Sequence, residues 1–370
     1  MTARTDLPDG GSVDVSVVIA TYNRTNSLLR LLKLLDEQTV AASRVEVIVV
    51  DDESVVDVAE AVRHERLVRC PQVIRQKNGG PAVARDAGIR RARAGLVVVL
   101  DDDMIVAPDF IAAHLEAHAD EPRAAVLGRL REPPGMRLRL FDRMQLALLD
   151  RLFDDVAAGL RRPSGGDMYT GNVSFRRADY LAVGGFDHTL RLSEDAELGM
   201  RLEAAGVKIV LSERAVAWHA SDHASLTAWV RRSIAYGEAD AAISRKQGPS
   251  SATDVWRYLF LVHPVSRPFL LASALAPALL VPVARVAILV AMGVDRLGLE
   301  RLALAGATFA YGILYFAGVR REAGSLVATL EGAWRYLRRR RDSGARNTDA
   351  TTTPALRCDA RDEQLGSRLP

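Results

Sequence analysis

The chain of 370 residues is 49% hydrophobic and 26% charged, so it can bury a sizeable core and wholesale disorder is excluded. Its formal net charge is only +3, and no nucleic-acid partner is expected because no strong positive field is available. The two cysteines, Cys70 and Cys358, are too few and too far apart for a disulfide framework or a thiolate metal site.

Four segments of the chain differ in composition. Residues 1–12 are polar, show no signal peptide and are expected to be disordered. Residues 13–246 have the composition of a soluble α/β domain. Residues 247–342 become apolar and are expected to be helical, and the polar tail 343–370 is expected to be disordered.

Strand and helix patterns alternate in the soluble segment. Short apolar runs predict buried strands at 15–20, 45–50 and 96–100. Leucines recur at helical spacing over residues 28–35, and residues 82–94 predict a helix closed by Gly95 in the C′ position. Apolar strands separated by helices predict an α/β fold with a mostly parallel sheet that is covered on both faces.

Aspartates follow two of the predicted strands. Asp51 and Asp52 end the second strand, and Asp101, Asp102 and Asp103 end the third. Ligands of open α/β sheets bind beyond the carboxyl ends of the strands. Adjacent carboxylates repel each other, and a hard cation such as Mg²⁺ relieves this repulsion with one or two carboxylate ligands. Asp-rich turns also follow strands without binding anything, but two neighbouring clusters favour the cation.

Seven short segments follow one another in order between residues 15 and 229: 17–24, 47–54, 78–88, 100–103, 171–177, 184–187 and 193–198. In sequence, order and spacing they resemble the motifs of the family-2 glycosyltransferases. The resemblance implies the GT-A nucleotide-diphospho-sugar transferase fold, which has a Rossmann-like, mostly parallel sheet. It also implies a nucleotide-sugar donor.

The chain departs from the family pattern at a few positions. Glu53 stands where the family usually has Gly, and Asp86 where it usually has Asn. Processive members carry a Gln-x-x-Arg-Trp motif after the Glu-Asp site, and residues 226–233 lack it. This absence favours transfer of a single sugar over polymer synthesis.

The resemblance implies catalytic roles for two adjacent acids. Asp195 is expected to be the general base that takes the proton of the acceptor hydroxyl, and Glu194 is expected to position Asp195 or the acceptor. Inverting transfer needs only one such carboxylate. The same acids also suit a helix start, with Ser193 as the N-cap, and the two interpretations are compatible.

A divalent metal, Mg²⁺ or Mn²⁺, is the expected cofactor. Asp103, assisted by Asp101, would hold the ion, which stabilises the charge that develops on the diphosphate leaving group. His219 follows a strand-like run and is either a further metal ligand or a structural histidine.

The nucleotide-sugar site is expected to draw on residues from several segments: Thr21, Tyr22, Asn23, Asp52, Gly79, Arg85 and Asp101. Asp52 would contact the base, and Gly79 would let the backbone approach a phosphate. Arg85 would face the diphosphate or, alternatively, be a solvated helix residue. Residues 129–166 match no motif and are expected to form a mobile lid over the acceptor.

The predicted function is inverting transfer of one sugar from a nucleotide-diphosphate sugar to an acceptor hydroxyl, for envelope glycan or glycolipid synthesis. A dehydrogenase is excluded because no Gly-x-Gly-x-x-Gly follows the first strand. A non-catalytic GT-A binding protein should have lost the metal acids or the base, which are present here. A membrane polysaccharide synthase is disfavoured by the missing Gln-x-x-Arg-Trp motif.

The apolar C-terminal region predicts a membrane-associated helical hairpin with candidate transmembrane segments at about 268–294 and 302–319. Arg285 interrupts the first segment, at a cost of roughly 2.5–3.5 kcal/mol near a bilayer centre. A re-entrant or interfacial first helix, or a buried hairpin on the catalytic domain, therefore remains open. Arginines flank both ends, which places the catalytic domain on the cytoplasmic face of the cell membrane and suggests a lipid-linked acceptor.

Overall fold

The computed structural model describes residues 13–220, 225–247 and 254–346. The predicted disordered N-terminus, residues 1–12, lies outside the described residues, and so do residues 347–370 of the predicted tail. The tail prediction is wrong for residues 343–346, because the last helix, α13 (Leu326–Arg346), continues through them.

One mixed sheet forms the centre of the α/β domain, with eight strands among the described residues in the order β3-β2-β1-β4-β7-β6-β8-β5. The three predicted strands are confirmed as β1 (Val15–Thr21), β2 (Val45–Asp51) and β4 (Leu96–Asp101), and β1 lies parallel between the other two. The others are β3 (Gln72–Arg75), β5 (Met104–Val106), β6 (Ala124–Arg131), β7 (Asn172–Arg176) and β8 (Lys208–His219). β7 runs antiparallel to β4 and β6, and β5 runs antiparallel to β8.

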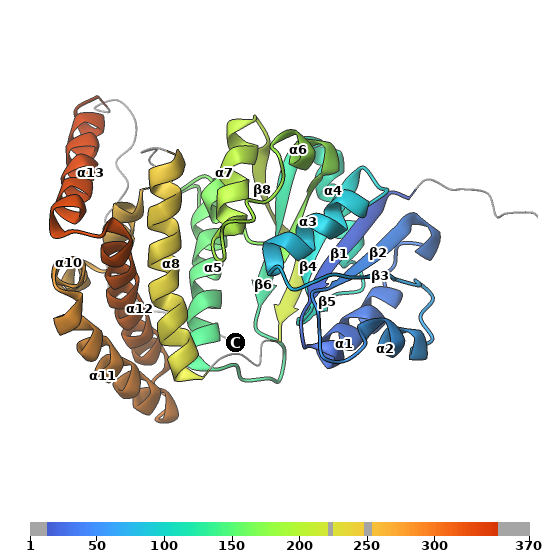
Figure 1. Cartoon of the computed structure of the whole chain (residues 1–370), viewed down its shortest axis with the longest axis horizontal. Helices are drawn as coiled ribbons and strands as arrows, with labels where there is room; N and C mark the ends of the chain where they lie inside the picture. Colours follow the sequence, from blue (N-terminus) through green and yellow to red (C-terminus); the bar gives the residue numbers. More distant parts are fainter. Residues whose placement is uncertain (1–12, 221–224, 248–253, 347–370) are drawn as a thin grey trace, which may run out of the picture.

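Helices cover both faces of this sheet, as the apolar strands predicted (Figure 1). They are α1 (Thr25–Asp36), α2 (Val58–His64), α3 (Pro81–Arg91), α4 (Phe110–Asp120), α5 (Leu140–Ala157), α6 (Arg177–Ala182) and α7 (Glu194–Ala204). The predicted end of α3 at Gly95 is wrong. The helix ends at Arg91 because the extended backbone of Ala92, with ψ of 136°, turns the chain away after its amide has bonded to the last turn.

The segment 129–166, which was expected to be a mobile lid, contains a long helix. The end of β6 leads through a short loop into the 18 residues of α5, which packs against β6 and against the C-terminal helix α12 (Glu300–Ala323). The segment is therefore a helical wall that joins the two parts of the molecule.

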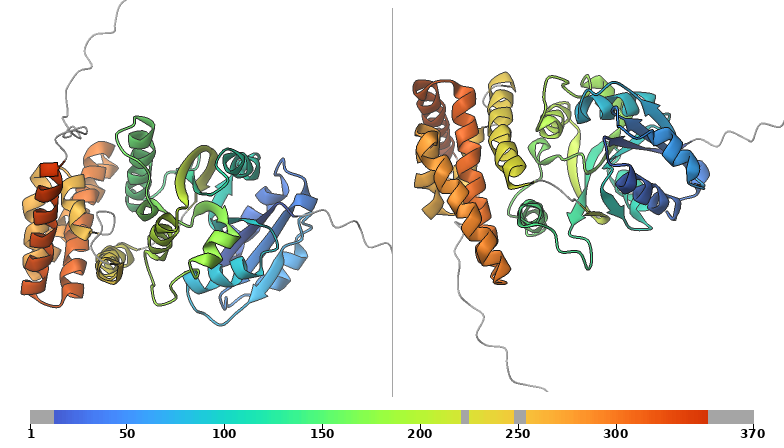
Figure 2. Two further views of the ribbon diagram at one scale, coloured as in Figure 1. Left: turned by 90° about the horizontal axis from the view of Figure 1, so that it is seen from above. Right: turned by 60° about the horizontal axis from the view of Figure 1, so that its bottom comes forward.

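The C-terminal part is a layer of helices beside the α/β domain (Figures 1 and 2). It contains α8 (Leu226–Gln247), α9 (Tyr258–Leu261), α10 (Arg267–Leu275), α11 (Pro277–Arg296), α12 and α13. The predicted hairpin is confirmed as α11 and α12, but the first candidate segment, 268–294, is broken at Ala276, where Pro277 begins a new helix. The domain boundary at 246 stays a prediction, because α8 packs mainly on α12.

Two glycines let α8 and α12 touch through their backbones. A Cβ atom on Gly237 would lie 1.9 Å from the carbonyl oxygen of Tyr315, and one on Gly318 would lie 1.9 Å from that of Ile234. Only glycine fits where the two helices cross. The crossing brings aromatic residues of α8 and α12 to the edge of the α/β domain.

Candidate active site

A cavity of about 800 Å³ opens at the carboxyl ends of β1, β2 and β4. The starts of α3 and α7 and side chains of α5, α8 and α12 complete its wall. Most of the residues predicted for the site line this cavity: Thr21, Tyr22, Asp52, Arg85, Asp101, Asp103, Glu194, Asp195 and His219. Asn23 and Gly79 are not among the lining residues.

Arg85 joins the two acidic parts of the cavity. Its guanidinium donates from Nη2 to Asp101 Oδ1 over 2.6 Å and from Nη1 to Glu194 Oε1 over 2.8 Å. Burial alone would lower the pKa of Arg85, but these two carboxylates outweigh it and raise the pKa. The alternative of a solvated helix arginine is wrong, since only 9% of the side chain is exposed.

A second arginine, Arg24, holds the aspartate turn after β4. Its Nη1 atom lies 3.1 Å from Asp102 Oδ1 and 3.0 Å from Asp103 Oδ2. The Thr21 hydroxyl donates to Asp102 Oδ2 over 2.7 Å. Burial raises the pKa of Asp102 to about 6, although Thr21 and Arg24 both favour its charged form. Sequence reasoning gave Arg24 no role, although it directly follows the nucleotide-binding turn.

The strand pair β5 and β8 brings His219 to the same turn. Met104 and His219 are register partners, and His219 Nε2 lies 3.4 Å from Asp103 Oδ2. Burial would lower the pKa of His219, but the hydrogen bond and charge of Asp103 outweigh it and raise the pKa.

The donor atoms at this edge suit Mg²⁺ or Mn²⁺. Asp101 and Asp103 offer carboxylate oxygens and His219 an imidazole nitrogen, which are accepted ligands of these ions. In the described part of the chain, no three His, Cys, Asp or Glu side chains are grouped so as to hold an ion by themselves. The residues therefore fit an ion that takes few protein ligands and completes its shell with water and phosphate oxygens.

Asp195 lies in the first turn of α7, across the cavity. Its Oδ1 atom accepts from the amide of Ala196 over 2.8 Å. Burial, and then the charge of Glu194, raise the pKa of Asp195 from 3.8 to about 7. This carboxyl group is therefore a weak enough acid to exchange a proton near neutral pH.

Ser193 takes the predicted N-cap position but does not cap α7 with its side chain. Its backbone is left-handed, with φ of 58°, and its hydroxyl donates to Asp240 Oδ1 of α8 over 2.7 Å. Such a conformation costs on the order of 1–3 kcal/mol and needs support from its surroundings. The contact with α8 supplies that support and fixes the start of the helix that carries Asp195.

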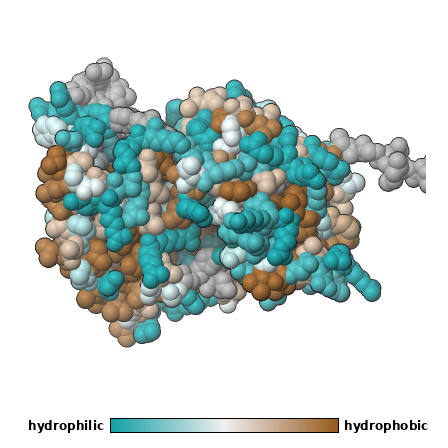
Figure 3. Space-filling view, viewed as in Figure 1, coloured by the Kyte–Doolittle hydropathy of each residue, from teal (hydrophilic) through white to brown (hydrophobic). Residues whose placement is uncertain are grey.

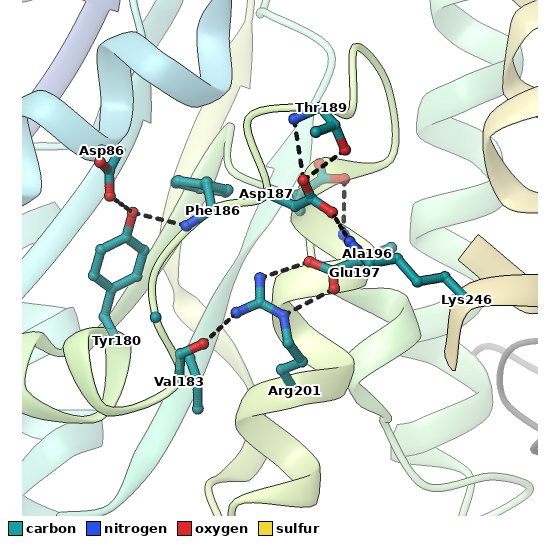
Figure 4. Close-up of polar contacts among 12 residues, drawn as sticks. Asp86, Tyr180, Val183, Phe186, Asp187, Thr189, Ala196, Glu197, Arg201 and Lys246 are labelled. Atoms are coloured by element: carbon teal, nitrogen blue, oxygen red, sulfur yellow. Dashed lines mark hydrogen bonds and ion pairs between the residues drawn. The ribbon is translucent and has the colours of Figure 1, made fainter. Parts of the chain in front are cut away.

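Polar contacts around the Gly-Gly-Phe-Asp turn hold α7 from the other side (Figure 4). The turn ends at Asp187, which pairs with Lys246 of α8 and accepts from the Thr189 amide over 3.0 Å. The Lys246 and Thr189 contacts lower the pKa of Asp187 to about 2. Arg201 of α7 donates to the carbonyl oxygen of Val183 over 2.6 Å.

Asp86, at the position where the family usually has Asn, takes part in the same network. Its Oδ1 atom accepts from the Tyr180 hydroxyl over 2.5 Å, and that hydroxyl accepts from the amide of Phe186 over 3.1 Å (Figure 4). Arg90 pairs with the other oxygen of Asp86 at 2.8 Å. The extra charge of the aspartate is thereby matched by an arginine.

The Asp52 carboxylate forms its hydrogen bonds with its own surrounding loop. Its oxygens accept from the amides of Gly79 and Gly80 over 3.0 and 2.8 Å and from Gln76 Nε2 over 2.8 Å. The Gly79 amide therefore faces Asp52 rather than the cavity. The neighbouring Glu53 has φ of 72°, a conformation that glycine adopts most easily, which explains the glycine that the family usually carries there.

Asn23 also serves the protein's own backbone. Its side-chain oxygen accepts from the backbone amide of Val55 over 2.8 Å, and its own backbone amide donates to the Ser54 hydroxyl over 2.9 Å. Asn23 thus ties the turn after β1 to the turn after β2, and Tyr22 beside it is the residue that faces the cavity.

The wall opposite the strands was missed by sequence reasoning. It contains Phe141 and Asp142 of α5, Trp229 and Arg232 of α8, and Tyr311 of α12. The rings of Phe141 and Trp229 stack with centroids 4.3 Å apart. Only the tertiary fold brings these helices together, so spacing along the chain carries no signal for them.

Asp142 and Arg232 bring opposite charges to this wall. Asp142 is 8% exposed, and its Oδ2 atom has no hydrogen-bond partner among the described residues. Arg232 donates to the Tyr236 hydroxyl over 3.1 Å and lies over its ring. Burial raises the pKa of Asp142, while His219, Arg139 and Arg232 act in the opposite direction.

The chain is similar to several known proteins. Residues 16–183 match the family model described as "Glycosyl transferase family 2". The validoxylamine A glucosyltransferase of Streptomyces hygroscopicus subsp. jinggangensis is 34% identical over 226 residues, which cover 54% of this chain and 53% of that protein. The succinoglycan biosynthesis protein ExoO of Rhizobium meliloti is 34% identical over 143 residues, or 38% of this chain and 40% of that protein. The chain spans about half the length of the validoxylamine glucosyltransferases.

A solved structure shares the fold. The mannosyltransferase PcManGT from Pyrobaculum calidifontis, in complex with GDP-Man and Mn²⁺, matches with a TM-score of 0.58 at 21% identity, over 83% of this chain and 86% of that chain. The GT-A fold expected from the sequence is thereby confirmed. The α/β domain, in which residues 16–183 match the family model, therefore resembles the domains of family-2 glycosyltransferases.

Proposed function

We propose that the protein is an inverting, non-processive glycosyltransferase that moves one sugar from a nucleotide-diphosphate sugar to an acceptor hydroxyl. The observation that carries this proposal is the position of Asp195. A carboxyl group whose pKa is raised to about 7 shares one cavity with the Asp101 and Asp103 carboxylates. Arg85 links the two sides by its hydrogen bonds to Asp101 and Glu194.

The donor would bind at the strand ends. Thr21, Tyr22 and Asp52 line that side of the cavity, and we assign the base and ribose to it. Asp52 would contribute its remaining lone pairs and the shape of its loop, and Asn23 and Gly79 would act through that loop rather than by contact. Arg85 would lie near the diphosphate, where its charge, shared between two carboxylates, opposes the charge of the leaving group.

A divalent ion is proposed beside the diphosphate, held by Asp103 with the assistance of Asp101, and His219 is the candidate for a further ligand. When bound, such an ion stabilises the negative charge of a diphosphate leaving group. Arg24, whose Nη1 atom lies 3.0 Å from Asp103 Oδ2, would keep Asp103 in place. The mannosyltransferase of the same fold was solved with GDP-Man and Mn²⁺, which supports the class of donor and ion without fixing either for this protein.

The acceptor would enter against the helical wall. The stacked Phe141 and Trp229 offer an apolar surface, and the unpartnered oxygen of Asp142 can accept a hydrogen bond from a hydroxyl group. Asp195 would then take the proton of the attacking hydroxyl as the new bond forms on the face opposite the diphosphate. Glu194, held by Arg85, would keep Asp195 in position.

Two other functions remain less well supported. A non-catalytic GT-A binding protein does not need a carboxyl group with a pKa near 7 opposite the metal acids, yet Asp195 is present and placed there. A membrane polysaccharide synthase is disfavoured because residues 226–233 lack Gln-x-x-Arg-Trp.

We also propose that residues 13–246 form the catalytic domain on the cytoplasmic face of the cell membrane, attached through the C-terminal hairpin. Among the described residues, α11 and α12 are the two helices long and apolar enough to cross a membrane by length and composition. The acceptor would then be a lipid-linked or envelope sugar, and the similarity to a succinoglycan biosynthesis protein supports that class.

The experiment is a donor screen with purified full-length protein. UDP-, GDP- and dTDP-sugars are tested for Mn²⁺-dependent hydrolysis and for thermal stabilisation, with and without EDTA. The proposal expects one donor to be turned over, and expects Asp103→Ala to abolish its turnover. Arg91→Met, on the exposed face of α3, is the matched control. Full activity in excess EDTA with a confirmed donor would refute the metal-dependent mechanism.

A further inference from the structure

Helix α11 carries an apolar stripe that nothing in the described structure covers. Its members are Leu279, Val283, Val286 and Val290, followed by Leu297 directly after the helix, each at least 43% exposed. Their spacings of four, three, four and seven residues place them on one face of the helix. Phe269, Leu271 and Leu275 of α10 are also exposed, and Figure 3 shows apolar surface gathered over the region of α10 and α11. Such a stripe is larger than a soluble surface needs and indicates a partner.

The turn between α11 and α12 is fastened to the α/β domain. Arg143 of α5 lies 2.5 Å from Asp295 and 2.6 Å from Glu300, the acids on either side of the turn. Its side chain is only 5% exposed, and Arg137 adds a contact to Asp295 at 3.1 Å. If the hairpin crossed a bilayer, this turn would lie on the far side of a hydrocarbon core about 30 Å thick. It could not then touch α5.

The two helices of the hairpin differ in burial. Of the apolar stretch of α11, 17% is buried inside the protein, against 61% for α12. Helix α12 packs along α8, where the Tyr315 hydroxyl donates to Asp240 over 2.8 Å. A membrane-crossing α12 would carry the charged helix α8 into the lipid with it. Helix α12 is therefore a core helix of the C-terminal layer, and α11 is its outer cover.

From these contacts we infer that α10 and α11 lie along one leaflet of a lipid bilayer, and that the hairpin does not cross it. The inference rests on the membrane association proposed above and defines its geometry. The apolar stripe of α11 enters the leaflet along the whole helix, and α12 stays in the protein. The catalytic cavity and the hairpin turn remain on the same side of the membrane.

Charge favours a lipid surface over a second copy of the chain. Arg285 and Arg296 are exposed, and their spacing of eleven residues puts both on one side of α11, about a third of a turn from the stripe. A helix lying in the interface keeps such side chains at the level of the lipid headgroups. In a helix that crossed the bilayer, Arg285 would lie near its centre. The arginines further predict a preference for anionic lipid.

The test measures depth along α11 in full-length protein. Single cysteines replace Leu279, Val286 or Leu297 in a Cys70→Ser, Cys358→Ser background, and each carries a nitroxide label. The protein binds vesicles of phosphatidylcholine and phosphatidylglycerol, and collision with oxygen and with a nickel chelate reports depth. The outer positions are about 27 Å apart along the helix. We expect all labels at one shallow depth, and a label at Arg91→Cys in water. A deep Val286 label between two shallow ends would overturn the inference.

The side of the membrane on which the hairpin turn lies gives an independent test. On vesicle-bound protein that retains Cys70 and carries Arg301→Cys beside the turn, we expect an impermeant maleimide to label both sites. Protection of Arg301→Cys until detergent is added would show that the turn has crossed. Binding to anionic vesicles should weaken about fivefold for each of Arg285→Gln and Arg296→Gln. Failure to bind vesicles, with a dimer in solution, would refute membrane attachment, while donor turnover on the same sample reports separately on the transferase.

Discussion

Replacing Arg85 by methionine should destabilise the protein more than any exposed arginine replacement on the same helix. The change keeps the length of the side chain but removes the cation that Asp101 and Glu194 share. Breaking a buried ion pair costs about 3–5 kcal/mol because a charge is left without its partner. Glu194 is 8% exposed, whereas Asp101 is 32% exposed and partly screened by water. We therefore expect Arg85→Met to lower the free energy of unfolding by the low end of this range, about 3 kcal/mol, mostly through the lost contact with Glu194.

The cost should depend on pH. At pH 8 the Asp195 carboxyl group is charged, since its pKa is about 7, and its repulsion with Glu194 is no longer balanced by Arg85. At pH 5 Asp195 is protonated, so Arg85→Met should lower the free energy of unfolding by less than at pH 8. Urea unfolding of full-length protein, followed by tryptophan fluorescence at both pH values, measures the difference. Arg91→Met, exposed on α3, should change the unfolding free energy by less than about 0.5 kcal/mol. If Arg85→Met matches that control at pH 8, the bridging role is refuted.

Three further changes test other parts of the account. Asp195 must be deprotonated to act as a base, so the rate of sugar transfer should fall about tenfold per pH unit below 7. Asp195→Asn should remove this fall from the pH–rate profile. An unchanged fall in the variant would exclude Asp195 as its source. Gly318→Ala places a methyl group against the Ile234 carbonyl and should lower the free energy of unfolding in urea by about 1–3 kcal/mol. The control Gly293→Ala has open space around it and should be neutral or stabilising. Equal effects of the two changes would contradict the close crossing of α8 and α12. Glu53→Gly should leave stability unchanged or raise it by up to about 1 kcal/mol in the same assay, and a clear loss would mean that its positive φ is not strained.

Local patterns predicted the strands that carry the site. The apolar runs at 15–20, 45–50 and 96–100 are buried on both faces, so their hydrophobicity was nearly continuous and easy to read. The acids after β2 and β4 followed directly, because a strand end fixes where the next side chains lie. The order of motifs then supplied the family.

Other features depend on contacts between distant segments. The helix α5 was mistaken for a lid because its apolar residues face α12 as well as β6, and no short motif reports such a partner. Asp142 and Trp229 reach the cavity only through that packing. Asp52 looked available for a ligand, but its oxygens bond to Gly79 and Gly80, which the sequence could not show. The docking of the hairpin turn on Arg143 was equally hidden, since its partners are more than 150 residues apart.

The proposed sugar transfer depends most on Asp195 as its base. One preparation of Asp195→Asn and one of the wild type should be compared for donor binding by calorimetry and for Mn²⁺-dependent turnover of the nucleotide sugar that the screen identifies. We predict that the variant binds the donor as tightly as the wild type and transfers sugar at least ~10²-fold more slowly. Transfer by Asp195→Asn at the wild-type rate would contradict the mechanism.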